Sequence, residues 1–228
     1  MISKEREKVF GLCPFIEYLK WLGLRQILEK NNWISMDEGS FVGKLRPHNE
    51  DVGMIHRFSG EELPQVLLHQ WWVWSHQQPY TEQTSDRKRL ISWQKFQAWL
   101  ESSKSKREFY MVVGRCKKLI AMAWMAEGKI LGDVKDFKLA DGVDGGCLLF
   151  DFSSAVRVYS ELGKGTGTAL KKIMMEDVEI RNSKMNGFWF STSIDNKASL
   201  RMNAKLGFRE LGRSEDERTV YMGKGIKA

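Results

Sequence analysis

The stretch at residues 162–170, Leu-Gly-Lys-Gly-Thr-Gly-Thr-Ala-Leu, decides the fold of this chain, because its alternate glycines separate two elements of different type. The apolar run at 147–158 before it predicts a strand, and 166–182 after it predicts a helix. Glycines let the backbone approach a ligand closely, and the first N–H groups of a helix have no partner within that helix. The stretch therefore predicts a loop that holds an anion at a helix N-terminus.

Two common phosphate-binding loops do not fit this stretch. A dinucleotide fingerprint needs Gly-x-Gly-x-x-Gly, but the last position falls on Thr168 or Leu170 in the two frames available. A P-loop needs Gly-Lys followed by Ser or Thr, whereas Lys164 is followed by Gly165. A simple glycine-rich turn with a helix cap is the remaining alternative if the loop is considered alone.

A second block follows after one predicted helix and one predicted strand, and the two blocks together resemble the GNAT superfamily of acyl-CoA N-acyltransferases. Gly163, Gly165 and Gly167 fall on the family's loop around the CoA pyrophosphate. The family's second motif, Asn-x-x-(Ala/Ser) and then Lys-x-Gly-Phe, matches Asn196, Ser199, Lys205, Gly207 and Phe208. The resemblance is best over residues 109–226, about half of the chain.

The sequence departs from the family pattern at two positions. Leu162 replaces the Arg or Gln that usually opens the loop, so one polar contact to the pyrophosphate is missing. Asn203 occupies the position at which many members carry a Tyr, proposed to protonate the departing thiolate. The pattern Asn-x-x-Ser-x-Arg is closer to the branch that includes ribosomal-protein N-terminal and amino-acid acetyltransferases.

The predicted architecture is an N-terminal extension, partly helical, at 1–50 and a GNAT-like domain at 51–228. This α/β (α+β) fold has a mixed, mostly antiparallel sheet with splayed central strands, flanked by helices. The extension contains a predicted helix at 14–30; dimerisation, giving a homodimer, or covering a substrate are its alternative roles. The other predicted elements are strands at 52–58, 109–115, 118–126, 147–158, 188–194, 209–212 and 219–223, a short strand near Ile130, and helices at 59–75, 86–102, 166–182 and 197–206.

The resemblance implies acetyl-CoA as cosubstrate, with no metal. CoA would lie between the strand before the loop and the strand that ends near Ile194. Its implied binding residues are Ala155, Val156, Arg157, Val158, Gly163, Lys164, Gly165, Thr166, Gly167, Thr168, Asn196 and Ser199. A backbone N–H near Val156 or Arg157 would stabilise the oxyanion, and Trp74 and Tyr80 are the expected substrate contacts.

The acceptor is expected to be an amine that attacks the thioester directly in a ternary complex. A Lys amine, with a pKa of about 10.4, loses about 4.6 kcal/mol at pH 7 to deprotonation, and an α-amine loses only about 1 to 1.4 kcal/mol. Asp151, His69 and His76 are the candidate bases, and Asn203 takes the place of the family acid. We therefore expect an amino acid, small amine or peptide N-terminus as acceptor.

Charge and cysteine content bound the remaining alternatives. The net charge is +7, and residues 81–120 carry ten Lys or Arg against four acids. This basic zone leaves open an acyltransferase directed at RNA or the translation machinery, whereas a degenerate fold that only binds CoA or a partner is the non-enzymatic alternative. Three widely spaced cysteines, the absence of an apolar span and a charged N-terminus favour a cytoplasmic protein without a membrane segment.

Overall fold

The computed structural model describes residues 40–45, 53–59, 63–75, 92–101, 107–114, 119–128, 130, 137–144, 150–158 and 165–225. Its helices are α4 (Gln65–Ser75), α6 (Trp93–Glu101), α8 (Thr166–Arg181) and α9 (Lys197–Lys205). Its strands are β1 (Ser40–Leu45), β2 (Gly53–Ser59), β3 (Arg107–Val113), β4 (Leu119–Glu127), β5 (Phe137–Leu139), β6 (Phe152–Val158), β7 (Gly187–Ser193), β8 (Arg209–Ser214) and β9 (Thr219–Gly225). None of the helices in these ranges is long and apolar enough to cross a membrane.

The strands form one sheet in the order β1-β2-β3-β4-β6-β7-β9-β8-β5. Every neighbouring pair is antiparallel except β6 and β7, which are parallel and are connected through α8. A parallel pair needs a crossover, so α8 runs back along the sheet, antiparallel to both strands. The parallel pair, β6 and β7, therefore lies at an interior position of the sheet, between β4 and β9.

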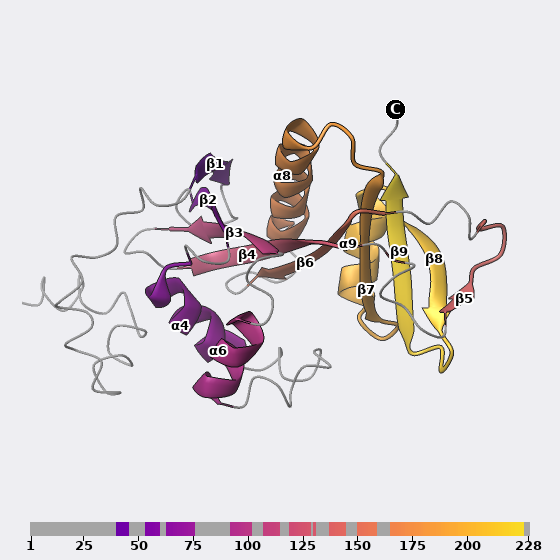
Figure 1. The fold of residues 1–228 in the computed structure, drawn as a ribbon, viewed down its shortest axis with the longest axis horizontal. Coiled ribbons are helices and arrows are strands. Elements are labelled where there is room, and N and C mark those ends of the chain that lie inside the picture. The colour runs from indigo at the N-terminus through magenta and orange to yellow at the C-terminus, as the bar shows by residue number, and fades with distance from the viewer. Residues whose placement is uncertain are drawn as a thin grey trace, which may run out of the picture.

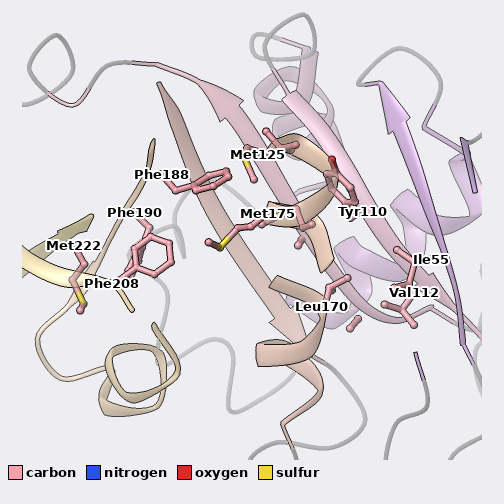
Figure 2. Packing of buried hydrophobic residues seen from close by; sticks show 14 of the residues in the cluster. Ile55, Tyr110, Val112, Met125, Leu170, Met175, Phe188, Phe190, Phe208 and Met222 are labelled. Atoms are coloured by element: carbon pink, nitrogen blue, oxygen red, sulfur yellow. The ribbon is translucent and has the colours of Figure 1, made fainter. Parts of the chain in front are cut away.

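Two apolar cores cover the two faces of the sheet, and β3 contributes to both by strict alternation. Phe109, Met111 and Val113 face α4 and α6, whereas Tyr110 and Val112 face α8. Figure 1 shows α4 and α6 on one side of β3 and β4 and α8 on the other. The core below α8 extends from Ile55 and Val112 at one end to Phe190, Phe208 and Met222 at the other, as Figure 2 shows. This continuous core joins the two halves of the sheet.

A polar cluster attaches the C-terminal half of α8 to β2 and β3. The Asp177 carboxylate accepts hydrogen bonds from Arg57 at 2.8 Å, from the Tyr110 hydroxyl at 2.7 Å and from Arg181 Nε at 3.0 Å. Arg181 also donates to both oxygens of Glu108, at 2.9 and 2.6 Å. Burial raises the pKa of Tyr110, and its hydrogen bond to Asp177 adds to this effect. The cluster therefore fixes the direction in which α8 points.

Two features of the sheet differ from the sequence-based expectation. The sheet begins with β1, inside the residues assigned to the extension, because Ser40–Leu45 pairs with β2. The short strand expected near Ile130 was wrong in position: β5 is Phe137–Leu139, which pairs with β8, and Ile130 packs with Phe150 in a separate buried cluster. The helix expected at 14–30 lies outside the described residues.

Candidate functional site

The candidate site is the opening between β6 and β7 beyond residues 153 and 189, where the two strands separate; we call this opening the splay. The two strands pair only through Phe152 with Phe188 and Ser153 with Trp189. Beyond these pairs, β6 continues to Val158 along β4 and β7 continues to Ser193 along β9. Figure 1 shows β7 turning away from β6. The facing edges at 154–158 and 190–193 therefore leave backbone groups for an extended ligand rather than for each other.

The N-terminus of α8 lies at the open end of this splay, because it follows the end of β6. Gly165 is the N-cap residue, with φ of 87°, and no atom lies within 4 Å of a Cβ built there. The first intrahelical bond runs from the Ala169 N–H to the Gly165 carbonyl at 3.0 Å. The N–H groups of Thr166, Gly167 and Thr168 therefore precede the helical ladder and carry the partial positive charge of the helix end.

One buried polar atom at this helix end has no protein partner among the described residues. Thr166 is 4 % exposed, and its Oγ1 lies without a hydrogen bond. A buried hydroxyl without a partner is unfavourable, so this atom indicates a place for a polar ligand. The first turn of α8 contains no acidic residue that would repel an anion. Gly163 and Lys164, the other expected loop residues, lie outside the described residues.

Asn196 and Ser199 are brought together at the start of α9. Asn196 is the N-cap residue, and its Oδ1 accepts a hydrogen bond from the Ser199 N–H at 3.1 Å. This is the usual side-chain cap of a helix, so the spacing Asn-x-x-Ser has a structural explanation of its own. Contact of either residue with CoA stays a prediction.

Asn203 is buried in α9 and holds a lysine that the sequence analysis missed. Its Nδ2 donates to the Ser199 carbonyl at 2.8 Å, and its Oδ1 accepts a hydrogen bond from Lys171 Nζ. Lys171 is 1 % exposed, and burial lowers its pKa well below the usual value. The helical period could have revealed it, because Lys171 lies on the same face of α8 as Met174, Met175 and the other buried residues.

The candidate bases are placed away from the open end of the splay. The Asp151 carboxylate accepts hydrogen bonds from the backbone N–H and the side-chain amide of Asn186, at 2.8 and 3.3 Å, beside the paired ends of β6 and β7. His69 stacks on Trp93 between α4 and α6, with ring centroids 3.9 Å apart, and burial lowers its pKa. Both side chains have structural partners, and their role as bases stays a prediction.

For the remaining expected site residues, the structure describes either the backbone alone or neither backbone nor side chain. Ala155, Val156, Arg157 and Val158 lie on β6 along the open edge, where the backbone is described and the side chains are not. Trp74 lies in α4 under the same condition. His76, Tyr80 and half of the basic zone at 81–120 are outside the described residues. No group of three or more His, Cys, Asp or Glu that could hold a metal occurs in the part of the chain that the structure describes.

Of the comparisons with known proteins, the one with solved structures gives matches in fold. No family model matches the sequence, and no curated protein matches it. Among solved structures, the aminoglycoside acetyltransferase AAC(6')-Ib in complex with coenzyme A matches with a TM-score of 0.52 and 18% identity, over 75% of this chain and 93% of that chain. RimL, a ribosomal L7/L12 α-N-protein acetyltransferase in complex with coenzyme A, matches with 0.54 and 12%, over 80% and 98%.

A third solved structure matches at a similarly low identity over most of both chains. The GNAT domain of PAT from S. lividans matches with a TM-score of 0.52 and 12% identity, over 81% of this chain and 96% of that domain. At such identities the likeness is one of fold. The splayed pair of parallel strands, the crossover helix between them and these three matches together show that the chain has the GNAT fold.

Proposed function

We propose that this protein is an acyl-CoA-dependent N-acyltransferase that transfers an acetyl group from acetyl-CoA to a primary amine. The observation that carries the proposal is the combination of the β6–β7 splay with an α8 N-terminus whose buried Thr166 hydroxyl has no partner in the part of the chain that the structure describes. AAC(6')-Ib and RimL, which share the fold, were both solved with coenzyme A. Acetyl-CoA would supply the activated acyl thioester.

The residues around the splay suit such a ligand. The N–H groups of Thr166, Gly167 and Thr168, with the Thr166 hydroxyl, would bind the pyrophosphate at the positive end of α8. Gly163 and Lys164 would complete that loop. The backbone of β6 at 155–158 would pair with the pantetheine amides, and an N–H near Val156 or Arg157 would stabilise negative charge on the reacting carbonyl oxygen.

The acceptor that fits best is an α-amine or another small amine. Asp151 accepts hydrogen bonds from Asn186 and His69 stacks on Trp93, so neither candidate base is placed at the open end of the splay. An α-amine needs far less help at pH 7, as the pKa difference above shows. AAC(6')-Ib is an aminoglycoside acetyltransferase, and RimL an α-N-protein acetyltransferase, so both acceptor classes belong in the assay.

Calorimetric titration with acetyl-CoA tests the donor side. We expect binding, and a dissociation constant weaker than about 1 mM would overturn the proposal. Gly165→Glu places bulk and negative charge at the expected phosphate site and should abolish that binding. Gly142→Glu is the matched control, because Gly142 also has a positive φ, of 76°, and open space around it, in the turn after β5. Equal binding by the two variants would refute the assignment of the loop.

A CoA-binding or partner-binding module without transferase activity is the second candidate. Asn203 favours it, because its amide is fully engaged by Lys171 and Ser199 and has no hydroxyl to donate. Release of the CoA thiol from acetyl-CoA separates the two candidates when it is measured across small amines, aminoglycosides and peptides with free N-termini. Turnover with any of these acceptors establishes the enzyme, and binding of acetyl-CoA without turnover favours the module.

A further inference from the structure

Lys171 is a buried cation with an unusual set of partners. Its Nζ donates to Asn203 Oδ1 and lies 4.2 Å from the ring centre of Phe190 and 4.3 Å from that of Phe208. The two rings themselves meet edge to face, with centroids 5.4 Å apart. Figure 2 shows Phe190 and Phe208 side by side at one end of the core. We call this arrangement of Asn203 and the two rings the lysine cage.

No described carboxylate neutralises the cage. The elements against which the Lys171 side chain packs, α9 and β7, present the amide of Asn203 and the ring of Phe190, and Phe208 follows α9. The cations of α9 are Lys197, Arg201 and Lys205, and all three are exposed. Aromatic faces and an amide oxygen favour the ammonium form, whereas burial opposes it. Among the described residues, the ammonium form of Lys171 therefore has the amide oxygen and the two rings, and no ion pair, to offset its burial.

The cage lies where the splay begins. Phe190 is the first residue of β7 beyond its pairing with β6, which ends at Trp189. α8 starts at the open end and runs toward the paired end, and at 1.5 Å per residue Lys171 lies about 8 Å along it from Thr166. A ligand that enters between the strands and reaches their point of separation would therefore approach the level of Lys171.

We propose that Lys171 supplies the positive charge that stabilises the thiolate formed when the acyl group leaves CoA, and that Asn203 is the positioning residue that holds it there. The inference rests on the proposed function. In that transfer the amine nitrogen bonds to the carbonyl carbon and the carbon–sulfur bond breaks. The electron pair of that bond goes to sulfur, and the proton of the attacking amine is released to solvent. Lys171 keeps its proton throughout and acts by charge alone.

The test measures the thiol pKa of bound CoA from the ultraviolet absorbance of the thiolate. A free thiol has a pKa near 8.5, and a cation within a few ångströms lowers it by about 1 to 3 units. We expect the bound thiol to show such a lowering in the unaltered protein and to lose it in Lys171→Met. The affinity for acetyl-CoA, which carries no thiolate, should stay unchanged, and kcat should fall roughly tenfold for each unit of pKa lost.

Two further variants keep the result interpretable. Lys172→Met is the matched control, because Lys172 is the next residue of α8 but is exposed and pairs only loosely with Glu176, at 3.7 Å. It should leave the thiol pKa as it is. The double variant Lys171→Met with Asn203→Leu removes the amide oxygen that the single variant would leave without its donor, and so protects against simple unfolding.

The outcomes distinguish this inference from the proposed function. If the unaltered protein binds no acetyl-CoA, both fail. If it binds and turns over acetyl-CoA but the bound thiol titrates like free CoA, the inference alone is overturned. An equal effect of Lys171→Met and Lys172→Met would also overturn it, because the exposed charge would then matter as much as the caged one.

Discussion

Within the described ranges, the Thr166 hydroxyl is the atom that most directly indicates a ligand, because it is buried and has no partner there. A buried hydroxyl without a partner lowers the stability of the free protein, whereas the same group bonded to a phosphate oxygen strengthens binding. The Thr166 hydroxyl is therefore expected to lower the stability of the free protein and to strengthen ligand binding. A hydroxyl bonded to a protein partner would instead raise the stability of the free protein.

Thr166→Val separates these effects, because valine has the same shape without the oxygen. We expect the free variant to be as stable as the unaltered protein or more so in thermal unfolding. Its acetyl-CoA dissociation constant should rise roughly tenfold to a hundredfold, because a hydrogen bond to a charged group contributes about 1.5 to 3 kcal/mol. Thr219→Val on β9 should leave binding unchanged. A loss of stability in Thr166→Val would mean that the hydroxyl has a protein partner after all.

Asp177 governs the acid stability of the fold. Burial by itself would raise the pKa of this carboxyl, but the hydrogen bonds from Tyr110 and Arg57 and the charge of Arg181 lower it below 3.8. Because the folded-state pKa is the lower one, the stabilisation is complete above pH 3.8 and is lost as the pH falls through the folded-state pKa.

Asp177→Asn should therefore lower the free energy of unfolding by about 1.5 to 3 kcal/mol near pH 7. The difference from the unaltered protein should shrink as the pH falls below 3.8. Urea unfolding at a series of pH values measures both quantities. Glu176→Gln, one residue earlier and exposed at the surface, should change stability by less than about 0.5 kcal/mol. A difference for Asp177→Asn that does not depend on pH would show that charge is not its cause.

Single residues also mark the limit of what the sequence predicts. The glycine loop and the Asn196–Phe208 block led to the right fold, because backbone requirements at a helix end are local and leave a motif. The pairing of Lys171 with Asn203 joins positions 32 residues apart, and neither residue type suggests the other. Asp151 was predicted as a base because it is a carboxylate on the central strand. Its contact with Asn186, 35 residues away, arises only from the tertiary structure.

The strands and helices show the same difference between features set by local sequence and features set by tertiary contacts. Long periodic segments such as α8, β3 and β4 were predicted within a few residues, because each buries a continuous apolar face. The short strands were not: β1 carries Gly43 in its middle, and β5 has three residues. Both are edge strands whose existence depends on a partner strand rather than on their own pattern.

The point at which β6 and β7 separate depends on a close backbone approach at Gly187. A Cβ at this glycine would lie 2.5 Å from the Lys224 carbonyl oxygen and 2.5 Å from the Phe150 ring, and its φ is 151°. Any side chain here would therefore push β7 away from β9 or from Phe150, at the end where the parallel pairing is only two residues long.

Gly187→Ala should lower the free energy of unfolding by about 1 to 3 kcal/mol through overpacking. It should also weaken acetyl-CoA binding, because it displaces one wall of the splay. The control is Gly225→Ala, since Gly225 is the cross-strand partner of Gly187 and has open space at its Cβ position. Denaturant unfolding and calorimetry measure the two effects. If both variants behaved alike, the close packing at Gly187 would not be what positions β7.

The molecule as a whole is a sheet of two halves that share little backbone pairing. Only two residue pairs connect β6 to β7, whereas β3 pairs with β4 through seven and β7 with β9 through seven. The apolar core under α8 carries the rest of the connection. A ligand held between β6 and β7 would replace the missing pairing, so binding should tighten the middle of the sheet more than its edges.

Hydrogen exchange measures this directly. In the free protein, alternate amides of 154–158 and 190–193 point into the splay and should exchange quickly, while those bonded to β4 and β9 exchange slowly. Saturating acetyl-CoA should slow the first group by binding their N–H groups or excluding water. Exchange along the interior of β3, which is paired on both edges, should change only as far as global stability rises. A uniform slowing across β3, β6 and β7 would mean that the ligand stabilises the fold from elsewhere, and the assignment of the splay as the binding site would then be wrong.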